Sequence, residues 1–210
     1  GQAYVFVRSG TSWSQQSVLV DSLGGAAGDA LGTSVAVSRD TAVIGAPFKT
    51  IGTKTQQGQA YVFVRSGTSW SQQAVLLDSA LGAGGDFCGT SVAVSGDTTV
   101  IGTPGKVVGA NPAQGQVYVF VRSGTSWSQQ AVLMDSRTGA AADYFGAAVG
   151  VSGDTVLISA YFKTVGGKAQ QGQAYVFVRS GTSWSQQAIL LDTASGAAMD
   201  SFGTSVSVSG

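Results

Sequence analysis

Apolar residues in this chain alternate with small or polar ones over short runs, and turn-forming residues separate the runs. In Gln2–Ser9, alanine and two valines fall on one side, while Tyr4 and Phe6 fall on the other. A period of two in segments rich in β-branched and aromatic residues predicts β-strands. No segment shows the 3.6-residue period of an amphipathic helix, so the pattern predicts an all-β protein.

The alternating pattern recurs at a fixed interval. The run GQAYVFVRSGTSWSQQ recurs unchanged or, in one copy, with Val117 in place of alanine. Its copies are 57 residues apart and begin at Gly1, Gly58, Gly115 and Gly172. Such a period is typical of a repeat protein. We therefore expect a single repeat domain over residues 1–210, with an incomplete last unit.

One unit divides into four strand segments, here named A to D. Segment A is Leu31–Ser38, B is Thr41–Pro47, C is Gln2–Ser9 and D is Ser12–Asp21. Gly-Asp or Arg-Asp pairs join A to B, and Ser-Gly-Thr joins C to D. These turns leave no room for a crossover helix, so they predict an antiparallel meander.

The faces of the segments indicate how the sheets pack. Segment C is apolar on both faces, which suits a sheet covered on both sides. Segment A has one face of small residues, Gly32, Ser34 and Ala36, which predicts close approach between copies. We therefore predict a β-propeller of four-stranded antiparallel blades, with A innermost and D outermost. The chain would hold fifteen strands, or about 3.7 blades by the 57-residue repeat.

The number of blades raises the question of ring closure. Four units would need 228 residues, and the chain has 210. The missing part corresponds to Asp40–Gln57, which is segment B with its following loop. An open array would leave apolar faces and strand edges exposed. We therefore expect either self-association that completes the ring or a fragment of a longer chain.

Composition narrows the classes of function. The formal net charge is zero, which gives no electrostatic footprint for nucleic acid. No apolar run approaches the length of a membrane helix, so we expect no membrane insertion. There is no histidine and no glutamate, and every acidic residue is an aspartate in a repeated position. We therefore predict no enzyme, no catalytic residue and no cofactor. Cys88 replaces Phe or Leu of other copies, which predicts a small buried hydrophobic residue.

Three other residue types recur with the unit. Asp21, Asp29 and Asp40 begin sets that indicate turn and strand-end structure, with a ring of carboxylates as the alternative. Trp13 and its repeats indicate packing on a neighbouring blade, with sugar stacking as the alternative. Arg8 and its repeats end segment C, where pairing with a repeat aspartate or a backbone carbonyl is expected.

The copies differ most in their longer loops. The B–C connections are Phe48–Gln57, Gly105–Gln114 and Phe162–Gln171, and the D–A connections lie between Asp21 and Leu31 and at the equivalent positions. In an up-and-down blade both sets emerge on one face, where binding residues are common, although long loops also diverge without a function. The candidate ligand-binding residues on this face are Lys49, Lys54, Lys106, Asn111, Arg137, Tyr144, Lys163 and Lys168.

Segments A and B also contain a family motif. The dipeptides Phe145-Gly146 and Phe202-Gly203, with the tripeptide Gly45-Ala46-Pro47, resemble the FG-GAP repeat of integrin α-subunits and related bacterial surface propellers. The resemblance implies a propeller used for adhesion or protein recognition, outside the cell or at its surface. Many family members carry a DxDxDG calcium loop between A and B. Here that turn has two residues and one aspartate, so we predict no metal site.

These observations leave three functional hypotheses. The leading one is a non-catalytic surface propeller that binds a macromolecular partner, a protein or a glycan, through its B–C and D–A loops. The second is a carbohydrate-binding lectin with sites repeated between blades. The third is an architectural or engineered repeat scaffold.

Overall fold

The computed structural model describes residues 1–22, 24–78 and 81–210. These residues form fourteen strands and no helix. No helix that could cross a membrane is therefore present in the described part of the chain. The strands are β1 (Ala3–Ser9), β2 (Ser12–Leu19), β3 (Ser34–Ser38), β4 (Thr41–Ala46), β5 (Gln59–Ser66), β6 (Ser69–Leu76), β7 (Ser91–Ser95), β8 (Thr98–Thr103), β9 (Gln116–Ser123), β10 (Ser126–Leu133), β11 (Val149–Ser152), β12 (Thr155–Ala160), β13 (Gln173–Ser180) and β14 (Ser183–Leu190).

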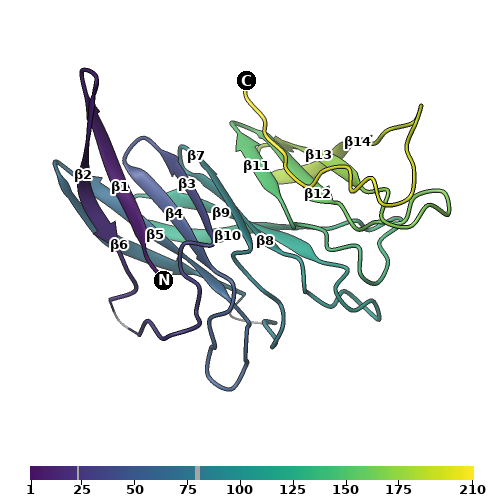
Figure 1. The fold of residues 1–210 in the computed structure, drawn as a ribbon, viewed down its shortest axis with the longest axis horizontal. Helices are drawn as coiled ribbons and strands as arrows, with labels where there is room; N and C mark the ends of the chain where they lie inside the picture. The colour runs from purple at the N-terminus through teal and green to yellow at the C-terminus, as the bar shows by residue number, and fades with distance from the viewer. Residues whose placement is uncertain (23, 79–80) are drawn as a thin grey trace.

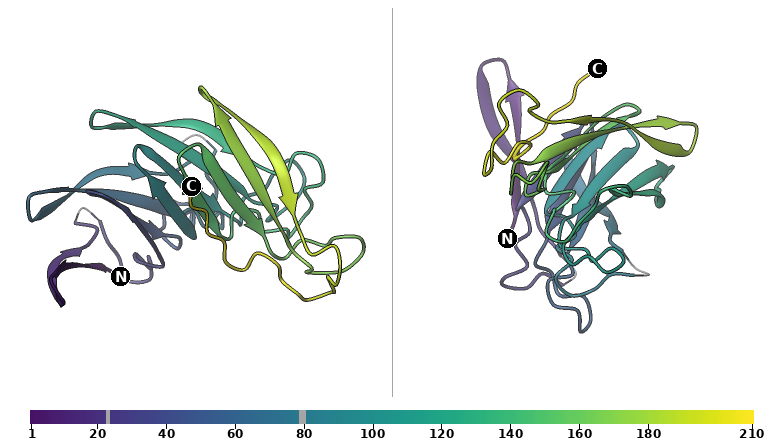
Figure 2. Two further views of the ribbon diagram at one scale, coloured as in Figure 1. Left: turned by 90° about the horizontal axis from the view of Figure 1, so that it is seen from above. Right: turned by 90° about the vertical axis from the view of Figure 1, so that its right-hand side faces the viewer.

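The strands form consecutive antiparallel sheets. The four-stranded sheets have the orders β3-β4-β5-β6, β7-β8-β9-β10 and β11-β12-β13-β14, and β1 pairs with β2 ahead of them (Figure 1). Each sheet therefore reads A-B-C-D from its inner edge outward. Figure 2 shows the sheets following one another in an arc. The prediction of an all-β fold with four-stranded propeller blades in 57-residue units is confirmed.

The inner strands require small residues. Strands β3, β7 and β11 lie side by side at the inner edges of their sheets. The Ser34 hydroxyl donates to the Gly89 carbonyl at 2.8 Å, and Ser91 donates to Gly146 at the same distance. A Cβ atom on Gly45 would lie 1.9 Å from the Gly89 oxygen. The glycine of the GAP element is therefore needed because two backbones meet there.

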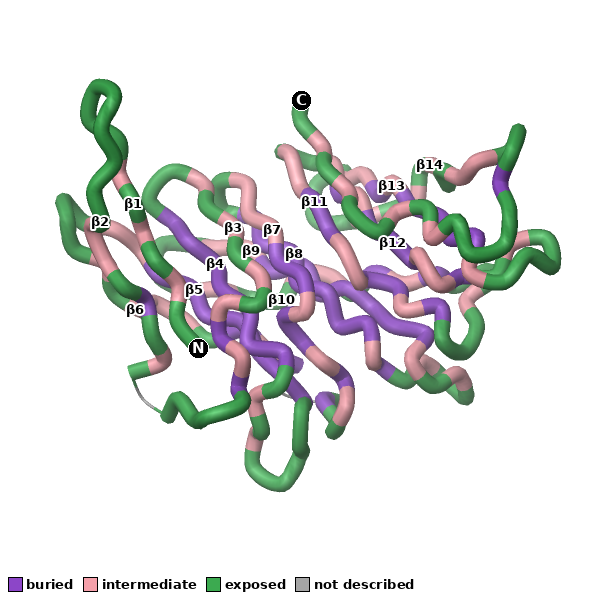
Figure 3. The backbone as a smooth tube through the Cα atoms, viewed as in Figure 1, coloured by how far each residue is buried: buried purple, intermediate pink, exposed green. Residues whose placement is uncertain are grey.

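The apolar core lies between neighbouring sheets rather than in one centre. One cluster joins Val43 and Val62 of one sheet to Val92, Ile101 and Tyr118 of the next. Figure 3 shows the buried residues concentrated along the middle strands. Burying such a side chain fully contributes about 1.5–3 kcal/mol, so each blade is stabilised by the neighbour that covers it.

Cys88 belongs to the same cluster and is only 1% exposed. Burial raises the pKa of its thiol to about 12, so the thiolate is disfavoured at neutral pH. The prediction that Cys88 is a small buried hydrophobic residue is confirmed.

The first sheet leaves an apolar surface uncovered. Tyr4 and Phe6 are each 53% exposed, whereas Tyr118 and Phe120 in the equivalent positions are 2% and 6% exposed. With Val35, these residues line a groove of about 460 Å³ between the first two sheets. The expectation of self-association at such a surface stays a prediction.

The prediction of a fifteenth strand is wrong. Residues 202–209 carry the sequence of segment A but form no strand. Segment A forms its ladder with segment B, and this last copy has no B segment beside it. The segment still lies along β11, where the Ser152 hydroxyl donates to the Gly210 carbonyl at 3.2 Å.

Candidate binding face

The B–C and D–A connections emerge together at one end of the strands, and we call this end the loop face. Each B–C connection contains a small hairpin closed by an isolated bridge, such as Ile51 with Lys54 and Val165 with Lys168. The short A–B and C–D turns lie at the other end, the turn face. Residues 23 and 79–80, which belong to the D–A connections, lie outside the described residues.

A buried ion-pair cluster lies under each B–C loop, and we call it the clasp. In the second copy, the Lys106 ammonium contacts a carboxylate oxygen of Asp78 at 2.9 Å and one of Asp86 at 2.9 Å. It also donates to the Leu81 carbonyl. The Tyr118 hydroxyl donates to Asp78 at 2.6 Å. All four side chains of Lys106, Asp78, Asp86 and Tyr118 are buried.

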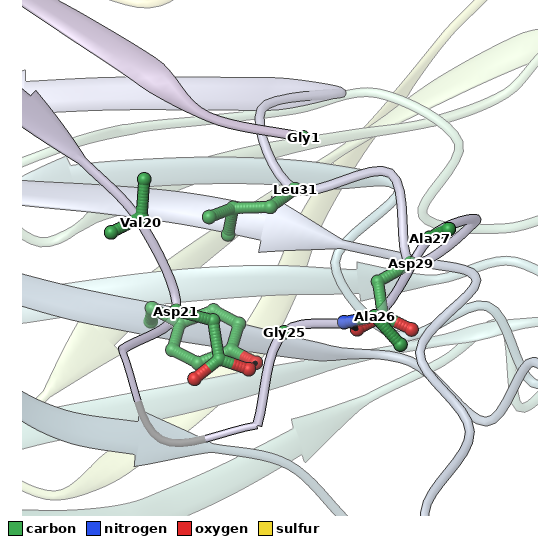
Figure 4. A pocket seen from close by; sticks show the side chains of 9 residues that line it. Gly1, Val20, Asp21, Gly25, Ala26, Ala27, Asp29 and Leu31 are labelled. Carbon is green, nitrogen blue, oxygen red and sulfur yellow. Dashed lines mark hydrogen bonds between the residues drawn. The ribbon is translucent and has the colours of Figure 1, made fainter.

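The clasp repeats with the unit. Lys49 pairs with Asp21 at 3.0 Å and with Asp29 at 2.8 Å, and the Tyr61 hydroxyl donates to Asp21 at 2.5 Å. Figure 4 shows Asp21 and Asp29 in the connection that folds back past Gly25 and Ala26. In the third copy the clasp consists of Lys163, Asp135, Asp143 and Tyr175.

Each clasp ties one blade to the next. Asp78 follows β6 at the end of one sheet, whereas Lys106 and Tyr118 belong to the following sheet. Opposite charges held this close favour the ionised forms of both partners. Burial alone would raise the pKa of Asp135, but bonds from Thr138 and Tyr175 and the charge of Lys163 outweigh it and lower that pKa to about 2. The clasp is therefore a charged inter-blade lock.

Aspartates also shape the D–A connections, as the sequence predicts. The backbone N–H of Ala26 donates to Asp29 at 2.8 Å, and that of Ala83 donates to Asp86 at 2.7 Å. The expectation of turn structure is confirmed for this set. The ion pairs with lysine were not predicted. Their signal is the lysine at positions 49, 106 and 163, which persists while the loop around it changes.

Three of the candidate ligand-binding residues belong to the clasps. Lys49, Lys106 and Lys163 were expected to face a ligand, but their ammonium groups are enclosed by aspartates and a backbone carbonyl. Lys106 is 7% exposed and Lys163 is 5% exposed. The structure gives these lysines a structural role, and we leave them out of the binding surface proposed below.

The other candidate residues are accessible. Lys54, Arg137 and Lys168 are exposed, and Lys168 donates to the Gly196 carbonyl. The Asn111 amide donates to Gln114 at 2.9 Å and to the Gly139 carbonyl at 3.2 Å. These four residues lie on four different connections, and the Asn111 amide reaches the connection that carries Arg137.

Tyr144, in contrast, belongs to a shared concave surface. A hollow of about 360 Å³ opens on the loop face, where the inner strands begin, and draws its lining from all four copies. We call it the aromatic hollow. Its main apolar side chains are Pro47, Phe48, Phe87, Pro104, Tyr144 and Tyr161. This volume falls within the range of small ligand sites.

The lining of the aromatic hollow differs from copy to copy. Phe87 and Tyr144 occupy the position held by Ala30 in the first copy and Ser201 in the last. All four residues have a left-handed backbone, with φ of 56° at Phe87 and 54° at Tyr144. That conformation is unfavourable for a bulky side chain, so stability alone does not explain an aromatic residue there.

Neighbouring residues hold the aromatic rings. The rings of Phe48 and Phe87 meet edge to face with centroids 5.9 Å apart, and Tyr144 lies 5.1 Å from Phe162. Gly105 replaces the phenylalanine of the other copies. A Cβ atom on it would lie 2.0 Å from the Gly85 carbonyl oxygen and 2.6 Å from the Phe87 ring, so the backbone of the D–A connection and Phe87 together leave room only for glycine.

The turn face carries a different kind of ion pair. Arg122 binds Asp97 with a shortest distance of 2.6 Å, and Arg65 and Arg179 pair in the same way with Asp40 and Asp154. The side chain of Arg8 instead donates to the Gly10 carbonyl at 2.8 Å. The prediction of an aspartate or a backbone carbonyl as partner is confirmed.

The tryptophans pack between blades, as predicted, except in the first copy. Trp70 and Trp127 each donate their indole N–H at 2.9 Å to a glutamine of the preceding sheet, Gln16 and Gln73. Trp184 bonds Gln130 in the same way. Trp13 is 66% exposed, because in this structure no sheet covers the outward face of the first two strands.

Successive four-stranded antiparallel sheets that pack face to face around shared inner strands define a propeller-like repeat protein. The family model for the FG-GAP repeat matches residues 13–63, 70–120 and 127–177. The chain therefore belongs to the FG-GAP repeat family. No protein in the curated set of characterised proteins matches the chain significantly.

Proposed function

We propose that this protein is a non-catalytic binding module that recognises a macromolecular partner through its loop face. FG-GAP propellers are in general a binding fold, which supports the class of function. The observation that carries the proposal is the aromatic hollow, whose lining varies between copies while the clasp under the B–C loops repeats. A location outside the cell or at its surface is part of this proposal and rests on the family resemblance.

The clasp also supports a separation on the loop face between residues that stabilise the fold and residues that bind. It immobilises the bases of the B–C and D–A connections, and binding residues on loops act best from such a rigid base. The lectin alternative has less support, because Trp70, Trp127 and Trp184 direct their indole N–H groups to glutamines of the adjacent blade. The scaffold alternative does not account for aromatic residues kept in a left-handed backbone.

A selection experiment tests the loop face. A library of random peptides displayed on phage would be selected against the whole chain, and a glycan array would be probed in parallel. Ligands should bind the wild type and lose binding to a Phe87→Ala, Tyr144→Ala double variant. The turn-face variant Asp97→Asn should bind as the wild type does. The proposal fails if neither method yields a saturable ligand, or if ligands bind the double variant equally well.

A further inference from the structure

The polar groups of the aromatic hollow point to a particular class of ligand. The hydroxyls of Thr33 and Thr90 line it, but they donate to the carbonyls of Ala30 and Phe87 at 2.7 and 2.8 Å. Thr204 donates in the same way to Ser201 at 2.8 Å. These donors are therefore already used within the protein.

Two donors remain at the hollow. In the described part of the chain, the phenol oxygens of Tyr144 and Tyr161 have no hydrogen-bond partner. The ring of Tyr161 lies 4.5 Å from that of Phe162, which also supports Tyr144. The hollow thus offers two tyrosine hydroxyls on a supported aromatic surface.

The hollow is also uncharged. Its lining consists of aromatic, proline, threonine and alanine side chains. The nearby aspartates of the first three copies are bound to lysines in the clasps. A charged group buried here would be left without a partner, which is strongly unfavourable. Electrostatics therefore favour a neutral occupant.

The kind of neutral occupant follows from hydrogen bonding. A sugar brings many hydroxyl groups, each of which needs acceptors as well as donors. A proline-rich segment has backbone carbonyls that accept from tyrosine, but its prolines have no N–H to satisfy. Its polyproline II conformation is also formed in advance, and aromatic-lined grooves recognise such segments.

We propose that the aromatic hollow binds a proline-rich peptide segment in the polyproline II conformation, with Tyr144 and Tyr161 donating to its carbonyls and Phe48 and Phe87 packing on its rings. This inference rests on the proposed function and names the chemistry of the partner. Tyr144 and Phe87 would be the specificity-determining residues, because the equivalent positions in the other copies hold alanine and serine.

The test uses a fluorescein-labelled decaproline peptide and the whole chain, with binding followed by fluorescence anisotropy. A peptide of alternating glycine and serine of the same length is the control ligand. We expect saturable binding of decaproline only, weakened at least tenfold by Tyr144→Ala and by Phe87→Ala. Tyr144→Phe should weaken binding by a smaller factor, because it removes the donor and keeps the ring.

Two controls keep the test interpretable. Asp97→Asn, on the opposite turn face, should bind decaproline as the wild type does. Circular dichroism and thermal unfolding would show that each variant is folded. The proposal is overturned if decaproline does not saturate up to 1 mM, or if Tyr144→Ala binds it unchanged. If the phage selection nevertheless yields loop-face ligands, the proposed function stands and only the ligand class is wrong.

Discussion

Each repeat pairs cations with aspartates at both of its ends, and the two ends differ in what water can reach. On the loop face, the side chains of Lys106 and Asp86 are 8% and 3% exposed. On the turn face, the Asp97 side chain that binds Arg122 is 66% exposed. The distances are similar, 2.9 and 2.6 Å, so geometry does not separate them.

Burial makes the difference between these pairs. The partners of an exposed ion pair are hydrated whether or not they are paired, so the pair contributes only about 0–1 kcal/mol to the free energy of folding. A buried pair contributes little more as a unit, but loss of one partner leaves a charge without water or counter-ion. Removing one partner of a loop-face ion pair should therefore cause a large loss of folding free energy, whereas removing one partner of a turn-face pair should cause a small loss.

Acid should weaken the clasps of the second and third copies, in which the pKa of an aspartate is lowered. Because Asp135 has a folded pKa of about 2 and an ordinary value of 3.8, its contribution to stability is complete above pH 3.8 and is lost as the pH falls toward 2. The pKa of Asp78 is lowered as well. Urea unfolding between pH 5 and pH 2 would measure the decline. An Asp135→Asn variant with the same acid profile as the wild type would contradict this assignment.

Alkali should weaken the clasp of the first copy, through ionisation of its tyrosine. Burial and the hydrogen bond to Asp21 raise the pKa of Tyr61 from 10.0 to about 12. Its contribution is therefore complete below pH 10 and is lost as the pH rises to about 12. Unfolding by urea at pH 9 and pH 11.5 would measure the change. Tyr61→Phe should show a smaller decline, and an equal decline would be evidence against the assignment.

Removing one clasp lysine should cause the largest loss from a single substitution. Lys106→Ala would leave Asp78 and Asp86 buried together without their cation, at a cost of about 3–5 kcal/mol. Equilibrium unfolding in urea gives the value. The control is Lys54→Ala, an exposed lysine of the same face, which should change stability by less than about 0.5 kcal/mol. Equal effects from both lysines would mean that the clasp is not a lock.

Removing one hydroxyl from the clasp should have an intermediate effect. Tyr118→Phe deletes the hydroxyl that donates to Asp78 at 2.6 Å and accepts from the Gln116 amide, and it keeps the buried ring. A hydrogen bond to a charged group contributes about 1.5–3 kcal/mol. Thermal and urea unfolding would measure the loss, and a double-mutant cycle with Lys106→Ala would show coupling. Strict additivity of the two substitutions would argue against one shared cluster.

The turn face should be the least sensitive. Asp97→Asn keeps the hairpin turn and removes the charge that binds Arg122. We expect a loss below about 1 kcal/mol, reduced further by salt. A loss of the size expected for Lys106→Ala would erase the distinction between the two faces.

The sequence predicts the local structure well and the inter-blade contacts only in part. Alternation and short turns are local, so they place every strand from β1 to β14 and their order within each sheet. The clasp could not be located, because Lys106 and Asp78 are 28 residues apart and meet only when two blades pack. Loop variation indicates Tyr144 as a candidate, but it does not indicate Phe87 and Tyr161, which line the same hollow. These residues come from different copies and line one hollow only because the sheets follow an arc, which the spacing of residues along the chain does not reveal.

The central claim is that the loop face divides its residues between those that hold the fold and those that bind. The free energy of unfolding of Tyr144→Gly, measured beside that of Lys106→Ala, tests this without any ligand. Glycine relieves the left-handed backbone at φ of 54° and loses the contact with Phe162. We therefore predict a change within about 1 kcal/mol for Tyr144→Gly, against about 3–5 kcal/mol for Lys106→Ala. Equal losses in the two variants would show that Tyr144 is a structural residue and would contradict the account.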